Sequence, residues 1–339
     1  MRDYPISRRH ALLSLPALTA VSRVLAQSSK PPIRVRSLNH VTLTVSDRKR
    51  SMEFYQGLFG FSVQHRQGVA VGLRIGSGPQ YISLSQGAAN VRPAIAHFCM
   101  TVDRFSVAGV TKSLADHGVV KGNPGPMKTW VRTRGPDAGG AKEGTPELYL
   151  GDPDGILVQL QDVSYCGGAG VLGNVCKSPE PPPAKGLLAV RDLSHFTLGV
   201  SDGKRSVAFY QDLFAMPVQT HQGAAPLLAV GAGRQFIALA GSIAVLQGTP
   251  GIGHGCFRME GFHPDKVLKA LADYGIKPRG SATGPAGPLV SYVSMRGEER
   301  GGAKGGTPEL YFTDPDGILM QIQDVTYCGG AGYLGDVCV

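Results

Sequence analysis

The sequence predicts an α+β protein with two tandem domains, each built from a pair of βαβββ modules. Two observations lead to this prediction: the chain repeats itself, and each repeat mixes short strand patterns with two amphipathic helical patterns. Residues 39–64 reappear as 194–219, and 147–176 agrees with 309–338 at 23 of 30 positions. A repeat of about 150 residues is the size of a domain and is too long for a solenoid unit.

Alternating residues rich in β formers predict a first strand, and apolar residues at helical spacing predict the helix that follows it. The pattern then restarts, and the second helix ends at Gly118, a residue type that often follows a helix. The second repeat has the same order. The elements expected in the first repeat are strand 39–45, helix 48–59, strands near 61–66, 69–75 and 80–85, strand 95–102, helix 106–117, and strands near 129–134, 147–151 and 156–163.

One eleven-residue phrase occurs twice, as DPDGILVQLQD at 152–162 and as DPDGILMQIQD at 314–324. Asp-Pro-Asp-Gly is typical of a turn, because Pro presets φ, Asp bonds its own backbone and Gly accepts positive φ. The strand that follows the first copy carries Gln159 and Gln161 on one face. Two glutamines side by side indicate a face that is solvated or that lines something polar.

The N-terminus has the pattern of an export signal. Arg8-Arg9, an apolar run and Val-Leu-Ala at 24–26 correspond to the three regions of a signal peptide. The run SRRHALL resembles a twin-arginine signal, with Ala11 where that pattern prefers Phe; a buried N-terminal helix is the alternative. The predicted organisation is an export signal at 1–26, a first domain at 33–176, a Pro-rich linker at 177–187 and a second domain at 188–339.

Charge and hydropathy exclude two classes of partner. The formal net charge is +9, which removal of the signal would lower to about +6, and no Lys/Arg cluster is interleaved with aromatics. Nucleic acid is therefore not an expected partner. No apolar run reaches the roughly 18–20 residues that span a bilayer. A small-molecule substrate is expected, in a periplasmic or secreted protein, and a homodimer is compatible with the sequence.

Four of the six cysteines lie in matching glycine-rich segments. Cys166 and Cys176 flank GGAGVLGNV, and Cys328 and Cys338 flank GGAGYLGDV. In an oxidising compartment each pair would close a local disulfide. A metal-binding pair is the alternative, although a nine-residue gap is not zinc-finger spacing. The sequence leaves the connectivity open.

The order of elements, with NHVTLTV…RSMEFYQGLFGF and ELYLGDPDGILVQLQ, resembles the vicinal-oxygen-chelate superfamily. Its members include glyoxalase I, bleomycin-resistance proteins, fosfomycin-resistance enzymes and extradiol ring-cleaving dioxygenases. The resemblance covers nearly all of 35–165 and 190–327. It implies that each pair of modules curls its sheet into a cup, and that the site lies inside the cup.

The resemblance also implies a divalent metal, with Fe²⁺ favoured and Mn²⁺ or Zn²⁺ as alternatives. Ligands in metal-dependent members come from the first strand of each module and from the last strand of the second. The matching positions here are His40, His97 and Gln159 in the first repeat and His195, His254 and Gln321 in the second. The family's third ligand is usually Glu. A neutral amide oxygen should bind metal less tightly than a carboxylate, so a metal-free cup is the alternative.

Two further pairs share strand faces with these residues. Tyr149 and Tyr311 stand ten residues before the glutamines, the spacing of an active-site tyrosine in extradiol dioxygenases. The resemblance implies that they hydrogen-bond a bound oxygen; aromatic packing is the alternative. Cys99 and Cys256 follow the second histidines by two residues. They are interpreted as small buried hydrophobes or, alternatively, as substrate-facing thiols or soft ligands.

Two arginines begin long polar loops. Arg134 begins 134–146 and Arg296 begins 296–308, and loops of this length often bind ligands. We expect either contact with an anionic substrate or a solvated loop base.

Other acidic and histidine residues are less clearly placed. Glu147 and Glu309 lie on the tyrosine face, where either offers the missing carboxylate. His65, His117 and His221 match no ligand position and are expected at the surface.

Together these features favour a metal-dependent enzyme that resembles extradiol-type dioxygenases and acts on a small substrate with vicinal oxygens. The alternatives are a glyoxalase-like isomerase or lyase, which normally needs a Glu that the segment QYISLSQG lacks, and a metal-free ligand-binding protein of the bleomycin-resistance type.

Overall fold

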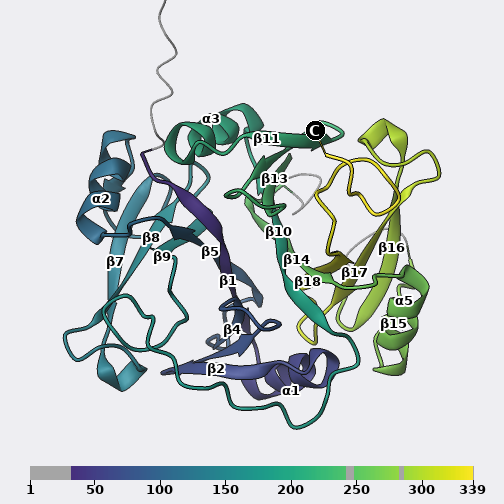
Figure 1. Ribbon diagram of the computed structural model, residues 1–339, viewed down its shortest axis with the longest axis horizontal. Helices are drawn as coiled ribbons and strands as arrows, with labels where there is room; N and C mark the ends of the chain where they lie inside the picture. Colours follow the sequence, from purple (N-terminus) through teal and green to yellow (C-terminus); the bar gives the residue numbers. More distant parts are fainter. Residues whose placement is uncertain (1–31, 242–247, 282–285, 339) are drawn as a thin grey trace, which may run out of the picture. The chain divides into compact units, whose positions relative to one another are not determined.

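A computed structural model describes residues 32–241, 248–281 and 286–338. These residues form two nine-stranded sheets, one from each repeat, and four α-helices (Figure 1). The predicted α+β class is confirmed. The predicted export signal at 1–26 lies outside the described residues.

The elements follow the same order in both repeats. The first repeat contains β1 Val35–Val45, α1 Arg48–Phe59, β2 Ser62–Gln67, β3 Ala70–Arg74, β4 Tyr81–Gln86, β5 Ala94–Val102, α2 Val107–Asp116, β6 Val120–Lys121, β7 Lys128–Arg134, β8 Thr145–Gly151 and β9 Leu157–Asp162. The second contains β10 Val190–Val200, α3 Gly203–Phe214, β11 Val218–Gln222, β12 Ala225–Ala229, β13 Phe236–Gly241, β14 Gly251–Met259, α5 Pro264–Asp273, β15 Lys277–Pro278, β16 Val290–Arg296, β17 Thr307–Thr313 and β18 Leu319–Asp324.

Each sheet joins two modules along its centre. The first has the order β2-β3-β4-β1-β5-β9-β8-β7-β6, and the second repeats this order with its own strands. Strands β1 and β5, the first of each module, pair antiparallel, and each also pairs parallel with the last strand of its module. The two-residue strands β6 and β15 were not expected, because such short segments have no periodicity to detect.

Capping residues explain where the first helix of each repeat begins and ends. The Asp47 side chain accepts a hydrogen bond from the Arg50 backbone N–H, and Gly60 ends α1 in the left-handed region at φ 67°. Helix α3 has the same cap at Asp202 but ends at Ala215, a non-glycine residue with φ 49°. Both helices bury one apolar face, as their spacing predicted.

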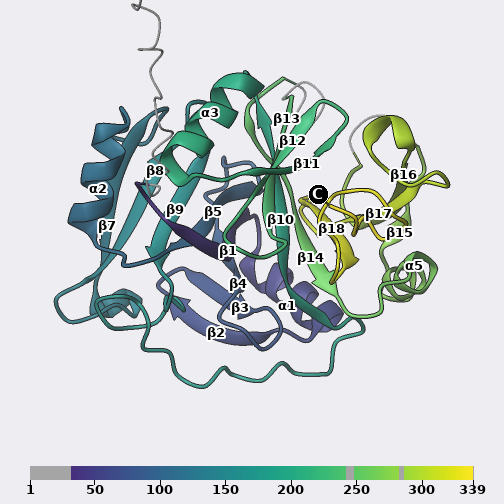
Figure 2. The ribbon, with the colours of Figure 1, turned by 45° about the horizontal axis from the view of Figure 1, so that its top comes forward.

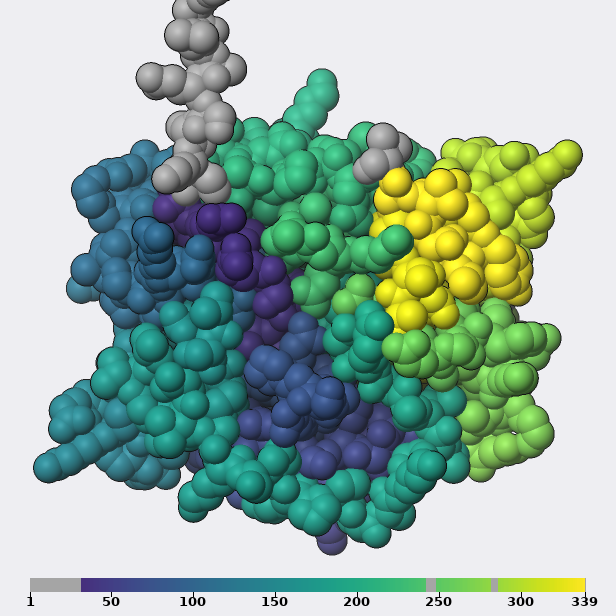
Figure 3. Space-filling view, viewed as in Figure 1, coloured from purple at the N-terminus to yellow at the C-terminus, as the bar shows by residue number. Residues whose placement is uncertain are grey.

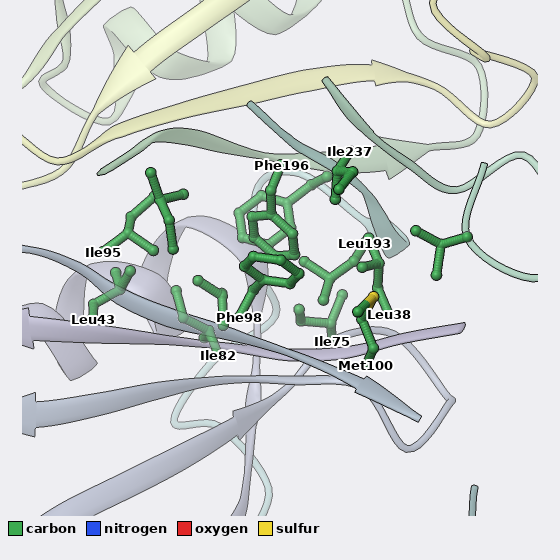
Figure 4. Packing of buried hydrophobic residues seen from close by; sticks show 14 of the residues in the cluster. Leu38, Leu43, Ile75, Ile82, Ile95, Phe98, Met100, Leu193, Phe196 and Ile237 are labelled. Atoms are coloured by element: carbon green, nitrogen blue, oxygen red, sulfur yellow. The ribbon is translucent and has the colours of Figure 1, made fainter. Parts of the chain in front are cut away.

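The two repeats share one hydrophobic core. Phe98 of β5 stacks on Phe196 of β10 with ring centroids 5.1 Å apart (Figure 4). The Phe59 ring of α1 lies 5.4 Å from that of Phe257 on β14. Burial of such rings is a major source of folding free energy. The two sheets therefore belong to one compact unit.

The Asp-Pro-Asp-Gly turn of the first repeat binds the first helix of the second repeat. Asp154 accepts a hydrogen bond from the Ser201 backbone N–H at 3.0 Å and forms an ion pair with Arg205. Asp152 accepts a hydrogen bond from the Tyr210 hydroxyl at 3.2 Å. The turn therefore has an interface role beyond leading into β9.

The second turn binds the first helix in the same way. Asp316 accepts from the Ser46 backbone N–H at 2.9 Å and pairs with Arg50, and Asp314 accepts from the Tyr55 hydroxyl at 3.3 Å. The contacts between the repeats are thus reciprocal.

The Pro-rich segment at 177–187 runs along the first repeat in teal (Figures 1 and 3). Glu180 forms a β-bridge with Val63 and an ion pair with Arg66, so the segment covers the edge of β2. The domain limits at 33–176 and 188–339 stay a prediction. In the described residues, no helix is long and apolar enough to cross a bilayer.

Both predicted disulfides are present. Cys166 bonds to Cys176, and Cys328 bonds to Cys338, each closing its own glycine-rich loop. The pairs suit an oxidising compartment.

Candidate functional site

A row of paired residues crosses the first sheet and presents its side chains on one face. Residues directly opposite each other on neighbouring strands point to the same side. The strand register forms the row Tyr81, His40, Cys99, Gln159, Tyr149 and Trp130. Two residues before Cys99, His97 joins the same face.

Within this row, two imidazoles converge on one amide oxygen. The Nε2 atoms of His40 and His97 each lie 3.0 Å from Oε1 of Gln159. The two rings meet edge to face with centroids 5.6 Å apart. We call these three residues the first histidine site.

The hydrogen bonds around His40 fix which ring nitrogen carries the proton. The Asn39 side-chain amide donates to the Tyr165 carbonyl at 3.0 Å, so its Oδ1 accepts from Nδ1 of His40 at 2.8 Å. A neutral imidazole protonated at Nδ1 has a lone pair on Nε2. That lone pair faces Gln159 Oε1, which is also an acceptor. Two acceptors 3.0 Å apart repel each other. Either a cation lies between them, or the Gln159 amide is rotated by half a turn so that its NH₂ group faces the ring.

Burial keeps both imidazoles neutral. Burial, together with the nearby His97 and His65, lowers the pKa of His40 well below 6.5. Burial likewise lowers the pKa of His97 to about 4, although the hydrogen bond to Gln159 opposes it. Neutral imidazole is the form that binds metal ions.

The second sheet carries the corresponding second histidine site, formed by His195, His254 and Gln321. His254 Nε2 lies 3.0 Å from Gln321 Oε1, and the two histidine rings are 5.5 Å apart. Burial lowers the pKa of His254 to about 4 and lowers that of His195 as well. At His195 Nδ1 the partner is the Ser194 hydroxyl, which can donate or accept. The tautomer is therefore fixed less firmly than in the first site.

The tyrosines and free cysteines lie beside these sites. The Tyr149 ring meets His97 edge to face at 5.4 Å, and the Tyr311 ring meets His254 at 5.3 Å. Cys99 and Cys256 are reduced and buried, and burial raises the pKa of both thiols. The structure therefore fits the interpretation of these cysteines as small buried residues.

The two loop arginines lie inside the protein, which differs from the expected substrate contact. The Arg134 guanidinium donates to Glu147 at 2.8 Å and to the Gly168 carbonyl at 2.8 Å. Arg296 is 0% exposed and bonds Glu309 at 2.7 Å. A buried guanidinium needs such a carboxylate partner. The arginines hold the disulfide loops against the sheets.

Glu147 is also occupied. Burial alone would raise its pKa, but Arg132 and Arg134 outweigh burial and hold the pKa below its ordinary value. The Tyr165 hydroxyl donates to the same carboxylate at 3.0 Å. Glu147 is therefore committed to a buried ionic cluster and does not act as the missing carboxylate of the first histidine site.

Only one of the three remaining histidines differs clearly from the expected surface position. His65 lies inside, with its ring edge-on to Tyr81 at 4.5 Å, and burial lowers its pKa to about 4. A Cβ atom at its strand partner Gly72 would lie 2.2 Å from the ring. His117 is half-buried and His221 is exposed.

The second histidine site opens into a cavity of about 2140 Å³. His254 and Tyr311 form part of its wall, and Arg279, Tyr292 and Arg300 lie around them. The Arg279 guanidinium sits 4.9 Å above the Tyr292 ring. Sequence reasoning missed these three residues, because nothing in their local pattern marks them.

The third donor of each histidine site is an amide, which is not among the side chains that usually form metal-binding clusters. Among the described residues, no group of three or more His, Cys, Asp or Glu side chains is placed to hold a metal ion. Each histidine site has two such residues, and its third donor is an amide. The spacing in the first histidine site fits a metal nonetheless, since cis ligands at about 2.1 Å from an octahedral ion lie about 3.0 Å apart.

Part of the chain matches a known family. Residues 37–160 match the Glyoxalase/Bleomycin resistance protein/Dioxygenase superfamily. A search of curated proteins found no significant match.

Solved structures share the fold at low identity. The Mn(II)-bound glyoxalase from Novosphingobium aromaticivorans is 16% identical, covers 86% of this chain and 82% of its own, and has a TM-score of 0.57. Homoprotocatechuate 2,3-dioxygenase from Arthrobacter globiformis is 19% identical, with 86% and 81% covered and a TM-score of 0.56. A catechol 2,3-dioxygenase is 15% identical, with 88% and 89% covered and a TM-score of 0.57. The chain therefore has the two-domain fold of these proteins, and residues 37–160 of its first repeat match the Glyoxalase/Bleomycin resistance protein/Dioxygenase superfamily.

Proposed function

We propose that the histidine sites are metal centres of an enzyme that resembles extradiol-type dioxygenases and acts on a small substrate with vicinal oxygens. The observation that carries this proposal is the opposition of two acceptors, His40 Nε2 and Gln159 Oε1, at 3.0 Å. A divalent ion bound to both would turn this opposition into ligation. The Asn39 contact to the other ring nitrogen is the outer support that metal-binding histidines usually have.

Fe²⁺ is the favoured ion, with Mn²⁺ or Zn²⁺ as alternatives. The ion would supply Lewis acidity and a template for two substrate oxygens. Two imidazoles and an amide are neutral ligands, so they do not balance the positive charge of the ion. The site therefore favours an anionic substrate.

The chain's own residues would bind and orient that substrate. Burial raises the pKa of Tyr311 well above 10, so its hydroxyl stays protonated. The hydroxyl donates to Glu309 at 3.3 Å and would turn from this long contact to donate to a substrate oxygen. Arg279 and Arg300 add positive charge to the cavity wall. These cavity residues support the second histidine site as the one that receives substrate. The predicted export signal would place this activity in the periplasm under our proposal.

Elemental analysis of the mature protein, purified without added metal, tests the proposal. We expect near-stoichiometric divalent metal in the wild type and its loss in His40→Ala plus His195→Ala. His263→Ala is the matched control, because His263 is exposed and lies outside both sites. No bound metal, and none taken up from solution, would overturn the proposal.

The metal-free alternative makes a different prediction. A half-turn of the amide would let Gln159 donate to both imidazoles, as in a ligand-binding protein without metal. A wild type of that kind would take up no added metal, and only Gln159→Glu plus Gln321→Glu would bind it, whereas a metal site binds metal in the wild type and should bind it at least about tenfold more tightly with carboxylates. Oxygen uptake over a panel of catechols then separates a dioxygenase from a lyase or isomerase.

A further inference from the structure

A second cavity lies where the two repeats meet, away from both histidine sites. It has a volume of about 460 Å³ and lies between the end of α2 and helix α3. His117 and Met127 come from the first repeat, and Phe209 and Asp212 come from the second. Figures 1 and 2 both show α3 beside the strands of the first sheet, on the side of α2.

The equivalent place in the other half of the molecule is filled by a tyrosine. Tyr274 occupies the position of His117, and its ring lies 5.7 Å from that of Phe54, the equivalent of Phe209. Its hydroxyl donates to the Phe54 carbonyl at 3.0 Å, with the Glu53 carbonyl at 3.4 Å. The chain thus holds a phenol in one of two equivalent positions.

The two positions differ by a matched pair of residues. Tyr274 lies over Gly57, where an added Cβ atom would come within 2.2 Å of the tyrosine hydroxyl. Asp212 takes the place of Gly57 in the other half, and only the shorter His117 leaves room for it. The His/Asp pair therefore opens the space that the Tyr/Gly pair closes.

The open position offers acceptors for a guest hydroxyl, and the Arg205 guanidinium that also lines it is paired with Asp154. His117 Nδ1 lies 2.8 Å from the Ser113 carbonyl, which can only accept, so Nε2 of the neutral ring is an acceptor. The Asp212 carboxylate is exposed to solvent and has no hydrogen bond or ion pair with another described residue. The Phe209 ring and the Met127 side chain supply the apolar wall.

We propose that this cavity is a binding site for a small phenol, held as the chain holds its own Tyr274. The aromatic ring would pack on Phe209, and the hydroxyl would donate to Asp212, His117 or the α3 carbonyls. The volume is within the range of small-molecule sites. This site is independent of the proposed metal chemistry and of its substrate.

Titration with p-cresol, which reproduces a tyrosine side chain, tests the proposal by calorimetry and by NMR of the intact protein. We expect one site per chain in the wild type and at least tenfold weaker binding in His117→Tyr plus Asp212→Gly. Toluene, which lacks the hydroxyl, should bind at least tenfold more weakly than p-cresol. His254→Ala should leave the affinity unchanged, because it alters only the second histidine site.

The reciprocal exchange gives an independent test in case the first variant does not fold. Tyr274→His plus Gly57→Asp should open the second position and raise the stoichiometry from one to two. The proposal is overturned if p-cresol does not bind the wild type, if closing the cavity leaves its affinity unchanged, or if His254→Ala abolishes binding.

Discussion

Buried charge is the residue-scale feature that local sequence patterns identify least well. Glycine-rich neighbours suggested that Arg134 and Arg296 face a substrate, yet both are buried against carboxylates. The contacts come from strand β8 or β17 and from the disulfide loops, more than ten residues away along the chain in each case. In contrast, the histidines and glutamines were found from sequence, since strand periodicity and the resemblance placed them on one face.

Replacing Arg296 with Met should strongly destabilise the protein. The substitution strands the Glu309 carboxylate in the interior, where an unpaired charge costs about 3–5 kcal/mol. The control is Arg66→Met, because the Arg66–Glu180 pair is exposed on both sides and should change stability by about 0–1 kcal/mol. Urea unfolding of both variants measures the difference, and equal losses would contradict the assignment.

The aspartates at the interface should make stability depend on pH. Burial raises the pKa of Asp152 and Asp314 to about 6 from 3.8, although backbone hydrogen bonds oppose it. The folded state therefore binds more protons than the unfolded state, and this contribution to stability falls as pH rises from about 4 to 6. Above pH 6 it is constant.

Asp152→Asn plus Asp314→Asn should remove that slope, because the amide keeps an acceptor oxygen and never ionises. Relative to the wild type, the variant should gain up to about 3 kcal/mol per site between pH 4 and 6.5. The free energy of unfolding, measured at half-unit pH intervals, tests this. A difference that does not change with pH would show that the two carboxyls do not titrate as described.

At the scale of strands, the two sheets use different residues to fill the same space. His65 pairs with Gly72 across β2 and β3, whereas Thr220 pairs with Leu227 across β11 and β12. A large residue faces a small one in each pair, but the order is reversed. His65 was expected at the surface because this compensation is visible only once the strand register is known. Strand order and turns were predictable, since both repeats carry their periodicity and turn residues.

Gly72→Leu alone should therefore destabilise the first sheet by about 1–3 kcal/mol, through overlap with the His65 ring. Adding His65→Thr should restore stability to within about 1 kcal/mol of the wild type, because the second sheet already uses this combination. A double-mutant cycle in urea gives the coupling energy. Additive losses would refute the compensation.

At the scale of the molecule, the sequence revealed the duplication but not how the copies meet. The Asp-Pro-Asp-Gly turns had a local explanation that was complete without a partner, so their contacts with the opposite helix could not be inferred. The Phe98–Phe196 stack could not be inferred either, because it also forms between the two copies.

The shared core predicts that the repeats unfold together. Calorimetry should show one transition with equal calorimetric and van't Hoff enthalpies. Asp154→Ala plus Asp316→Ala should lower Tm but keep a single transition, because the apolar core between the sheets remains. Two separate transitions in the wild type would mean that each repeat is stable alone.

The reciprocal contacts between each Asp-Pro-Asp-Gly turn and the first helix of the other repeat also have a consequence for how the duplicated chain evolved. An ancestral single repeat with the same turn and helix would have recognised a second copy of itself, so pairing would predate the gene fusion. In such a symmetric pair every mutation appears twice. Fusion would end that constraint and allow the equivalent positions to differ, as they do at Tyr274 with Gly57 and His117 with Asp212.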